Sequence, residues 1–239
     1  MTATQITPAE WQLLTRKRVV FGHQSVGQNI LDGLQSLAAQ NHIDLTVKKS
    51  REPVNSNGIF HFFVGDNGNP AAKFKDFTDT LESGMAQQAD IALLKLCYID
   101  FTAATDAQQI AGQYISTLDR LSREFPHTTF IAVTTPLTTL QTGPKAWVKR
   151  LLGRQPSGYA DNARRQEFNE LLRLHYGPQG RLFDLARIET GSAGEQRYQG
   201  RPLEVLDPML AADEGHLNPH GEKVVAERFI KFLATLPRS

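Results

Sequence analysis

The stretch Arg18-Val-Val-Phe-Gly-His-Gln-Ser-Val-Gly27 joins a compact apolar run to a segment with a helical pattern. The apolar run indicates a buried strand that ends in a turn at Gly22. After the turn, apolar residues recur at helical spacing, at Ile30, Leu31, Leu34, Leu37 and Ala38. Ser25 is therefore predicted to lie between a strand and a helix.

The rest of the chain repeats this alternation. Apolar runs near residues 43–47, 90–97, 128–134 and 181–184 indicate further strands, and helical patterns separate most of them. Strands that alternate with helices form right-handed crossovers and a parallel sheet covered on both faces. We therefore expect an α/β fold, a three-layer α/β/α sandwich with a central parallel sheet of about five strands. The pattern predicts a single domain over residues 1–239, with long loops at 50–72 and 137–160.

Composition excludes several classes of function. The chain has 239 residues, of which 40% are hydrophobic and 21% are charged, as in an ordinary globular protein. Lys and Arg number 26 and Asp and Glu number 25, so the net charge of +1 provides no overall field for nucleic acid. The single cysteine, Cys97, excludes an intramolecular disulfide framework. Nucleic acid is thus not an expected partner.

The first residues show no basic cluster followed by an apolar stretch, which a secretory signal would require. Thr7-Pro-Ala-Glu10 is instead typical of a helix capping box. No run approaches the roughly 20 apolar residues of a membrane span. We expect no integral membrane segment and a cytoplasmic location.

A second informative stretch, Asp213-Glu-Gly-His-Leu-Asn218, precedes the last helical pattern. A serine hydroxyl is a weak nucleophile unless an imidazole takes its proton, and that imidazole needs a carboxylate to hold its tautomer. Sites on parallel sheets form at the carboxyl ends of the strands, where Ser25, residues 97–100 and residues 213–216 are all predicted to lie. The sequence thus predicts a triad of Ser25, His216 and Asp213.

These two stretches resemble the motifs of the SGNH or GDSL-type hydrolases. Gly22-His-Gln-Ser25 is similar to the Gly-Asp-Ser turn of that family, with His23 in place of the aspartate, and Asp213-Glu-Gly-His216 matches its Asp-x-x-His motif. The resemblance implies the flavodoxin-like SGNH fold and no cofactor. It also implies that Ser25 is the nucleophile, His216 the general base and then acid, and Asp213 the residue that orients the imidazole.

An acyl-transfer site also needs hydrogen-bond donors for the oxyanion. The backbone N–H of Ser25 is one, and the resemblance implies a glycine N–H, for which Gly65 is the preferred match and Gly58 a rival. The family's third donor is an asparagine in a Gly-x-Asn-Asp motif, but this chain has Ile99 at that position.

Asn67 and Tyr98 are the candidates to replace the missing donor. His23 is expected either to form hydrogen bonds within its turn or to contact the helix or the substrate.

Other chemistries fit less well. Gly22 and Gly27 have P-loop spacing, but Gln28 and Asn29 stand where lysine and a hydroxyl residue would be needed. His216 and His220 have a zinc-ligand spacing, but the last helix is predicted to begin between them. Cys97 has no charged partner nearby to activate it. No metal site is expected.

The segment Lys145-Ala-Trp-Val-Lys-Arg-Leu-Leu-Gly-Arg154 has four cationic and no acidic residues, with apolar residues between them. It is interpreted either as a lid that attracts an anionic substrate or membrane surface, or as a solvated helix packed on the body.

The sequence predicts a serine esterase that cleaves a small acyl ester, with an O-acetylated carbohydrate as one substrate class, through an acyl-Ser25 intermediate. The expected partner is a small-molecule or glycan ester. Two alternatives remain: a catalytically weak binding module of the same fold, motivated by Ile99, and an O-acyltransferase, which shares the acyl-enzyme intermediate.

Overall fold

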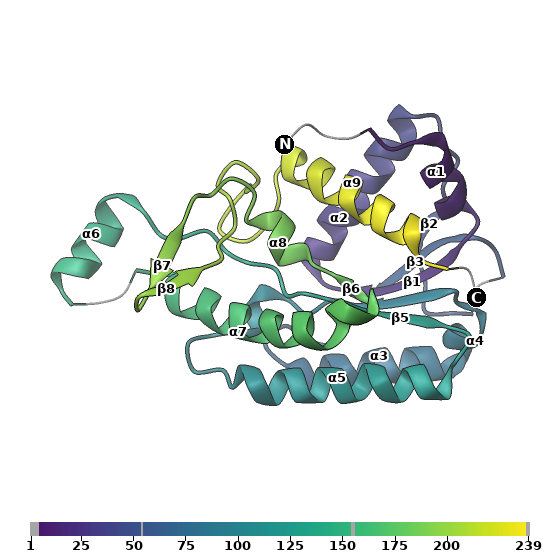
Figure 1. The fold of residues 1–239 in the computed structure, drawn as a ribbon, viewed down its shortest axis with the longest axis horizontal. Helices are drawn as coiled ribbons and strands as arrows, with labels where there is room; N and C mark the ends of the chain where they lie inside the picture. The colour runs from purple at the N-terminus through teal and green to yellow at the C-terminus, as the bar shows by residue number, and fades with distance from the viewer. Residues whose placement is uncertain (1–4, 54, 154–155, 238–239) are drawn as a thin grey trace.

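The computed structural model describes residues 5–53, 55–153 and 156–237, with a central sheet between two layers of helices (Figure 1). Six parallel strands form this sheet in the order β2-β3-β1-β4-β5-β6, and β7 and β8 form a separate antiparallel hairpin. The strands are β1 Arg18–His23, β2 Val47–Lys49, β3 Gly58–Phe63, β4 Ile91–Leu94, β5 Thr129–Val133, β6 Leu182–Phe183, β7 Gln196–Tyr198 and β8 Arg201–Leu203. The α/β class predicted from sequence is confirmed, with six strands in the main sheet.

One face of the sheet is covered by α1, α2, α8 and α9, and the other by α3, α5 and α7 (Figure 1). The helices are α1 Pro8–Thr15, α2 Ser25–Gln40, α3 Pro70–Thr80, α4 Ala86–Gln88, α5 Ala107–Glu124, α6 Gly143–Leu151, α7 Tyr159–Tyr176, α8 Leu185–Glu189 and α9 Pro219–Thr235. A π-helical turn spans Leu81–Met85, and short 3₁₀ turns span Tyr98–Asp100 and Gly177–Gln179.

The alternation of side chains along each strand produces two cores. Val19 and Phe21 of β1 point into the α2/α9 side, whereas Val20 points into the α3/α5 side. Both faces of the sheet are therefore apolar, as expected for parallel strands buried on both sides.

The predicted loops at 50–72 and 137–160 need correction, since the first contains the whole of β3 and the first residues of α3. The segment Gly58-Ile-Phe-His-Phe-Phe63 is a buried strand paired with β1. The sequence pattern did not indicate this strand, because Asn- and Gly-rich segments flank it. Both of its faces are covered, so its residues do not alternate between apolar and polar. The strand expected at 43–47 begins only at Val47, and the second loop contains α6 and the start of α7.

The packing of α2 against α9 brings the two ends of the chain together. A Cβ on Gly33 of α2 would lie 2.4 Å from the carbonyl oxygen of Glu222 in α9, so the two backbones touch at this glycine. Asn218 caps α9 through a 2.9 Å hydrogen bond from the Gly221 N–H, and Pro219 occupies its first turn. These contacts place the start of α9 beside the middle of α2. Among the described residues, no helix is long and apolar enough to cross a bilayer.

Candidate active site

Ser25, His216 and Asp213 form a continuous chain of hydrogen bonds at the carboxyl end of β1. Ser25 is the first residue of α2, and its Oγ lies 3.0 Å from Nε2 of His216. Nδ1 of the same imidazole lies 2.8 Å from Oδ2 of Asp213. The structure therefore brings together the three side chains that the sequence predicted to meet.

The local turn holds Asp213 in place. Its Oδ1 accepts hydrogen bonds from the backbone N–H groups of Gly215 and His216, each at 2.8 Å. Partial burial would raise the pKa of Asp213, but these two bonds and the contact with the His216 ring outweigh it and lower that pKa. Because an ionised carboxylate only accepts, Nδ1 of His216 carries the proton and Nε2 is free to accept one from Ser25.

Tyr98 packs on the imidazole. Its ring meets that of His216 edge to face, with centroids 5.7 Å apart. A Cβ on Gly215 would lie 2.6 Å from the Tyr98 ring, so a side chain there would push the Asp213–His216 turn away. Burial raises the pKa of Tyr98 to about 12, which keeps the phenol neutral.

Two further residues join Ser25 to its surroundings, and sequence reasoning assigned them no role. Gln24 donates from Nε2 to the carbonyl oxygens of Val64 and Gly65, at 2.6 and 3.0 Å. Asn29 donates to Glu222 Oε1 at 2.7 Å and accepts from the Leu217 N–H at 3.4 Å. Asn29 thus ties the helix that carries Ser25 to the residue after His216.

His23 lies beneath the serine and faces away from solvent. Its Nδ1 donates to the carbonyl oxygen of Gln24 at 2.8 Å, so its Nε2 accepts from Nδ1 of His61 at 2.9 Å. The pKa of His23 is lowered to about 3, mainly by desolvation and also by Lys95, His61 and Lys49, although the hydrogen bond to Gln24 raises it.

A Cβ on Gly27 would lie 2.4 Å from the His23 ring, so this ring also fixes the first turn of α2. Of the sequence hypotheses for His23, the structure supports hydrogen bonding within the turn and contact with helix α2, whereas the fully buried side chain leaves no surface for a substrate.

Gly65 is not available as an oxyanion donor, which corrects the sequence prediction. Its N–H donates to Oδ2 of Asp76 at 2.8 Å, and Asp76 is itself paired with Arg51. The rival Gly58 donates its N–H to the carbonyl oxygen of Lys17, at the opposite end of the sheet. Neither glycine has a free N–H near Ser25.

Asn67 is held by a buried ion pair. Lys73 and Asp100 have fully buried side chains 2.7 Å apart, and Lys73 Nζ also donates to Oδ1 of Asn67 at 3.0 Å. Asp100 accepts from the N–H of Gly68 at 2.8 Å. These bonds fix the loop after β3 to the turn after β4, on either side of β1. Because the oxygen end of the Asn67 amide faces Lys73, its NH₂ end is directed away from the pair.

A cleft beside the His216 turn, here called the Tyr98 cleft, has a volume of about 450 Å³. It is lined by Tyr98, Ile99, Phe101, Thr102, Thr138, Thr139, Gln141, Ser157, Gly158, Asp161, Arg165 and Glu214. Glu214 belongs to the same turn as Asp213 and His216, and its carbonyl oxygen accepts from the Thr139 N–H at 2.8 Å. The Tyr98 cleft therefore lies beside the turn that carries His216, although Ser25, His216 and Asp213 are not among its lining residues.

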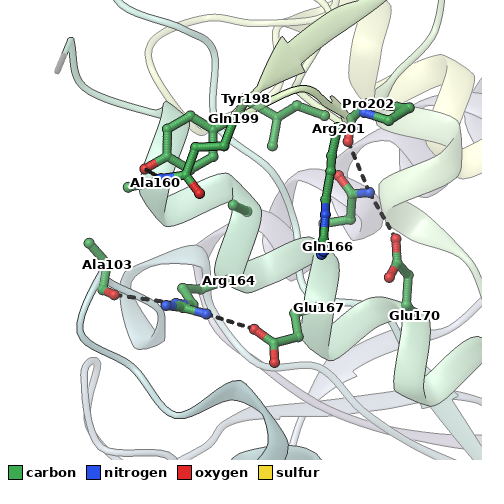
Figure 2. Close-up of a pocket in the computed structure, with 12 residues that line it drawn as sticks. Ala103, Ala160, Arg164, Gln166, Glu167, Glu170, Tyr198, Gln199, Arg201 and Pro202 are labelled. Atoms are coloured by element: carbon green, nitrogen blue, oxygen red, sulfur yellow. Dashed lines mark hydrogen bonds and ion pairs between the residues drawn. The ribbon is translucent and has the colours of Figure 1, made fainter.

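A larger groove of about 620 Å³ lies elsewhere, between α7 and the β7–β8 hairpin (Figure 2). Its polar side chains bond mainly to one another: Arg164 to Glu167 and the Ala103 carbonyl, and Gln166 to Glu170 (Figure 2). None of Ser25, His216 and Asp213 lines this groove.

The competing chemistries find no support in the geometry. Cys97 is fully buried. His216 lies before α9 and binds Ser25, whereas His220 lies within that helix. Within the described ranges, no three His, Cys, Asp or Glu side chains group closely enough to hold a metal ion.

No family model matches the chain, and no curated protein matches it. Solved structures do match. The periplasmic domain of a lipopolysaccharide acetyltransferase from Salmonella ser. Paratyphi A has 12% identity and a TM-score of 0.53, over 95% of this chain and 88% of that one.

A member of the lipolytic protein G-D-S-L family from Veillonella parvula has 12% identity and a TM-score of 0.51, over 92% of this chain and 98% of that one. At such low identity the likeness concerns the fold. The chain has the α/β fold of the SGNH/GDSL hydrolases, as the sequence motifs predicted.

Proposed function

We propose that this protein is a serine hydrolase that cleaves a small acyl ester through an acyl-Ser25 intermediate. The observation that carries the proposal is the unbroken chain of hydrogen bonds from Ser25 through His216 to Asp213. A serine placed in this way has its proton acceptor in position and its imidazole tautomer fixed.

The steps follow from the geometry. Oγ of Ser25 attacks the ester carbonyl carbon while its proton passes to Nε2 of His216, and Asp213 stabilises the imidazolium that forms. The tetrahedral intermediate then expels the alcohol, which takes the proton from Nε2, and leaves an acyl group on Oγ. A water molecule repeats the attack with His216 as base, which releases the carboxylic acid and restores Ser25.

The oxyanion requires donors on the side of Ser25 away from the imidazole. The N–H of Ser25 lies in the first turn of α2, where backbone N–H groups have no partner within the helix and the helix dipole favours negative charge. We assign the role of second donor to the side-chain amide NH₂ group (Nδ2) of Asn67. Gln24 holds the loop after β3 against the turn of Ser25, and Lys73 fixes the direction of the Asn67 amide.

The Tyr98 cleft fits the alcohol part of the ester, because Tyr98, which packs on the imidazole that must protonate the leaving oxygen, and Glu214 of the same turn both line it. Its polar lining includes Thr139, Gln141 and Asp161, which suit a hydroxyl-rich group. The single cation in its lining, Arg165, already donates to the Tyr98 carbonyl and to the side chains of Thr138 and Asn162. The cleft therefore favours an uncharged alcohol such as a sugar over an anionic one.

The test compares the wild type with Ser25→Ala and His216→Ala. Purified protein should release p-nitrophenol from the acetate ester and become labelled by a fluorophosphonate, and Ser25→Ala should abolish both reactions. His216→Ala should also abolish hydrolysis, because Ser25 then lacks its proton acceptor. Hydrolysis that survives in Ser25→Ala would remove this residue from the mechanism, and no hydrolysis by the wild type would favour the binding module.

Acyl transfer to a second alcohol is the alternative that a comparison favours, since the Salmonella domain of the same fold is an acetyltransferase. Both reactions share acyl-Ser25, and they differ in which acceptor removes the acyl group. Turnover that rises with added sugar, and yields the acylated sugar, would identify a transferase.

A further inference from the structure

Helix α6 gathers exposed apolar side chains on the outside of the molecule. Trp147, Val148, Leu151 and Leu152 are 62%, 48%, 66% and 67% exposed. These residues lie three to four positions apart or adjacent, so the helical path brings them to one side of α6 and its C-terminal turn. Ala146, by contrast, is buried, so the opposite side of α6 faces the rest of the protein.

The helix also projects from the body. In Figure 1, α6 stands apart at one end of the molecule, beyond the β7–β8 hairpin. Of the nine large hydrophobic residues that are exposed in the described structure, four lie in this short segment. A patch of this kind marks a surface that contacts another apolar phase.

The charge of the segment indicates which phase that is. Residues 143–154 include Lys145, Lys149, Arg150 and Arg154 and no acidic residue. An exposed apolar stripe that contains tryptophan and leucine, with only basic residues around it, is typical of helices that lie in the interface of an anionic membrane. We propose that residues 143–152 dock the protein on an anionic lipid surface.

This surface is less suited to a second copy of the chain. Two α6 helices packed face to face about a twofold axis would bring six cationic residues together, three from each helix, without an acidic residue in either helix. A lid that closes on the active site is also disfavoured, because the apolar side chains point away from the body while Ala146 faces it.

Docking through α6 would bring the active site to the membrane. The excursion that carries α6 is closed at its base by the N–H of Gln141, which donates to the Ser157 carbonyl at 3.1 Å. Lys149 Nζ donates to Ser157 Oγ at 2.9 Å. Gln141 and Ser157 also line the Tyr98 cleft. The mouth of that cleft would therefore lie close to the lipid surface, although lipid binding itself does not depend on ester chemistry.

The two tryptophans give a direct readout, because Trp11 is 3% exposed and Trp147 is 62% exposed. The purified full-length protein is mixed with phosphatidylcholine vesicles, with or without phosphatidylglycerol, and binding is measured by flotation and by the shift of tryptophan emission. We expect a blue shift and co-flotation only with phosphatidylglycerol, both weakened when salt rises from about 0.05 to 0.5 M.

Leu151→Ala/Leu152→Ala keeps Trp147 and should weaken vesicle binding by at least about tenfold. Leu174→Ala/Met209→Ala removes two equally exposed side chains from other surfaces and should leave binding unchanged. Circular dichroism confirms that both variants fold.

Three results would overturn the proposal: no vesicle binding, binding that is insensitive to the Leu151/Leu152 change, or a blue shift without lipid that depends on protein concentration. The last result would identify self-association instead.

Discussion

Replacing Asn67 by alanine removes the proposed side-chain donor to the oxyanion and leaves Ser25, His216 and Asp213 untouched. Loss of one such donor typically lowers turnover about 10²- to 10³-fold. Asn67 is exposed, so a water molecule can partly replace the hydrogen bond from its side-chain amide, and we expect a loss at the lower end of that range. A fall of about 10² in kcat corresponds to about 2.7 kcal/mol in the activation free energy.

The matched control is Asn69→Ala, two residues away in the same loop. Asn69 caps α3 by accepting from the N–H of Ala72 at 3.1 Å, so its loss should cost about 1 kcal/mol of stability without slowing the reaction. The assay measures kcat and KM with an acetate ester, and the melting temperature of each variant. If Asn67 donates to the oxyanion, Asn67→Ala should lower kcat while KM and the melting temperature change little.

The variant Lys73→Met provides a second test, because it removes the hydrogen bond that orients the Asn67 amide and keeps the amide itself. It should lower kcat, and, because it leaves the buried Asp100 without its cationic partner, it should also destabilise the fold. If Asn67→Ala keeps kcat within about threefold of the wild type, against the loss of about 10² expected for a donor, the oxyanion must be stabilised elsewhere and the assignment fails.

Three more changes test other parts of the structure. Asp213→Asn removes the negative charge that stabilises the imidazolium. In the wild type the pKa of Asp213 lies below its usual value, so this charge is present throughout the working pH range. The variant should therefore lower kcat by at least about 10² near neutral pH. Gly27→Ala places a methyl group against the ring of His23 and should lower both the melting temperature and the rate of fluorophosphonate labelling. Gly112→Ala, at a glycine with open space inside α5, should raise the melting temperature slightly and leave the labelling rate unchanged.

Glu189 is fully buried, and burial raises its pKa from 4.5 to about 8. The folded protein then holds a proton that the unfolded chain releases, so this residue makes the free energy of unfolding fall as pH rises from about 5 to 8. Urea titrations across that range should show a smaller fall for Glu189→Gln, and an unchanged slope would contradict the buried, protonated state.

The sequence predicted what depends on local pattern. The apolar run before Gly22, the start of the last helix between His216 and His220 and the capping box at Thr7 are set by neighbouring residues, and all three are present. The triad was predicted because its members lie at the carboxyl ends of strands or just before a helix.

Long-range partners were not predictable in the same way. Nothing near Asn29 in the chain shows that it will bind Glu222, and nothing near Gly65 shows that Asp76 will take its N–H. Such bonds depend on how α2 meets α9 and on how the loop after β3 meets α3. Strand β3 was missed for a related reason, since its buried character comes from the neighbouring strands and helices.

The site is therefore assembled from two separate supports on either side of Ser25. On one side, the contact between α2 and α9 and the bonds of Asn29 set the distance from Ser25 to His216. On the other, the buried pair of Lys73 and Asp100 sets the position of Asn67. Because the supports share no residue, changes on the first side should alter proton transfer, and changes on the second should alter stabilisation of the oxyanion. Under the proposed mechanism, the isoleucine at position 99 would leave the chemistry intact, because Asn67 of the neighbouring loop would supply the donor that isoleucine lacks.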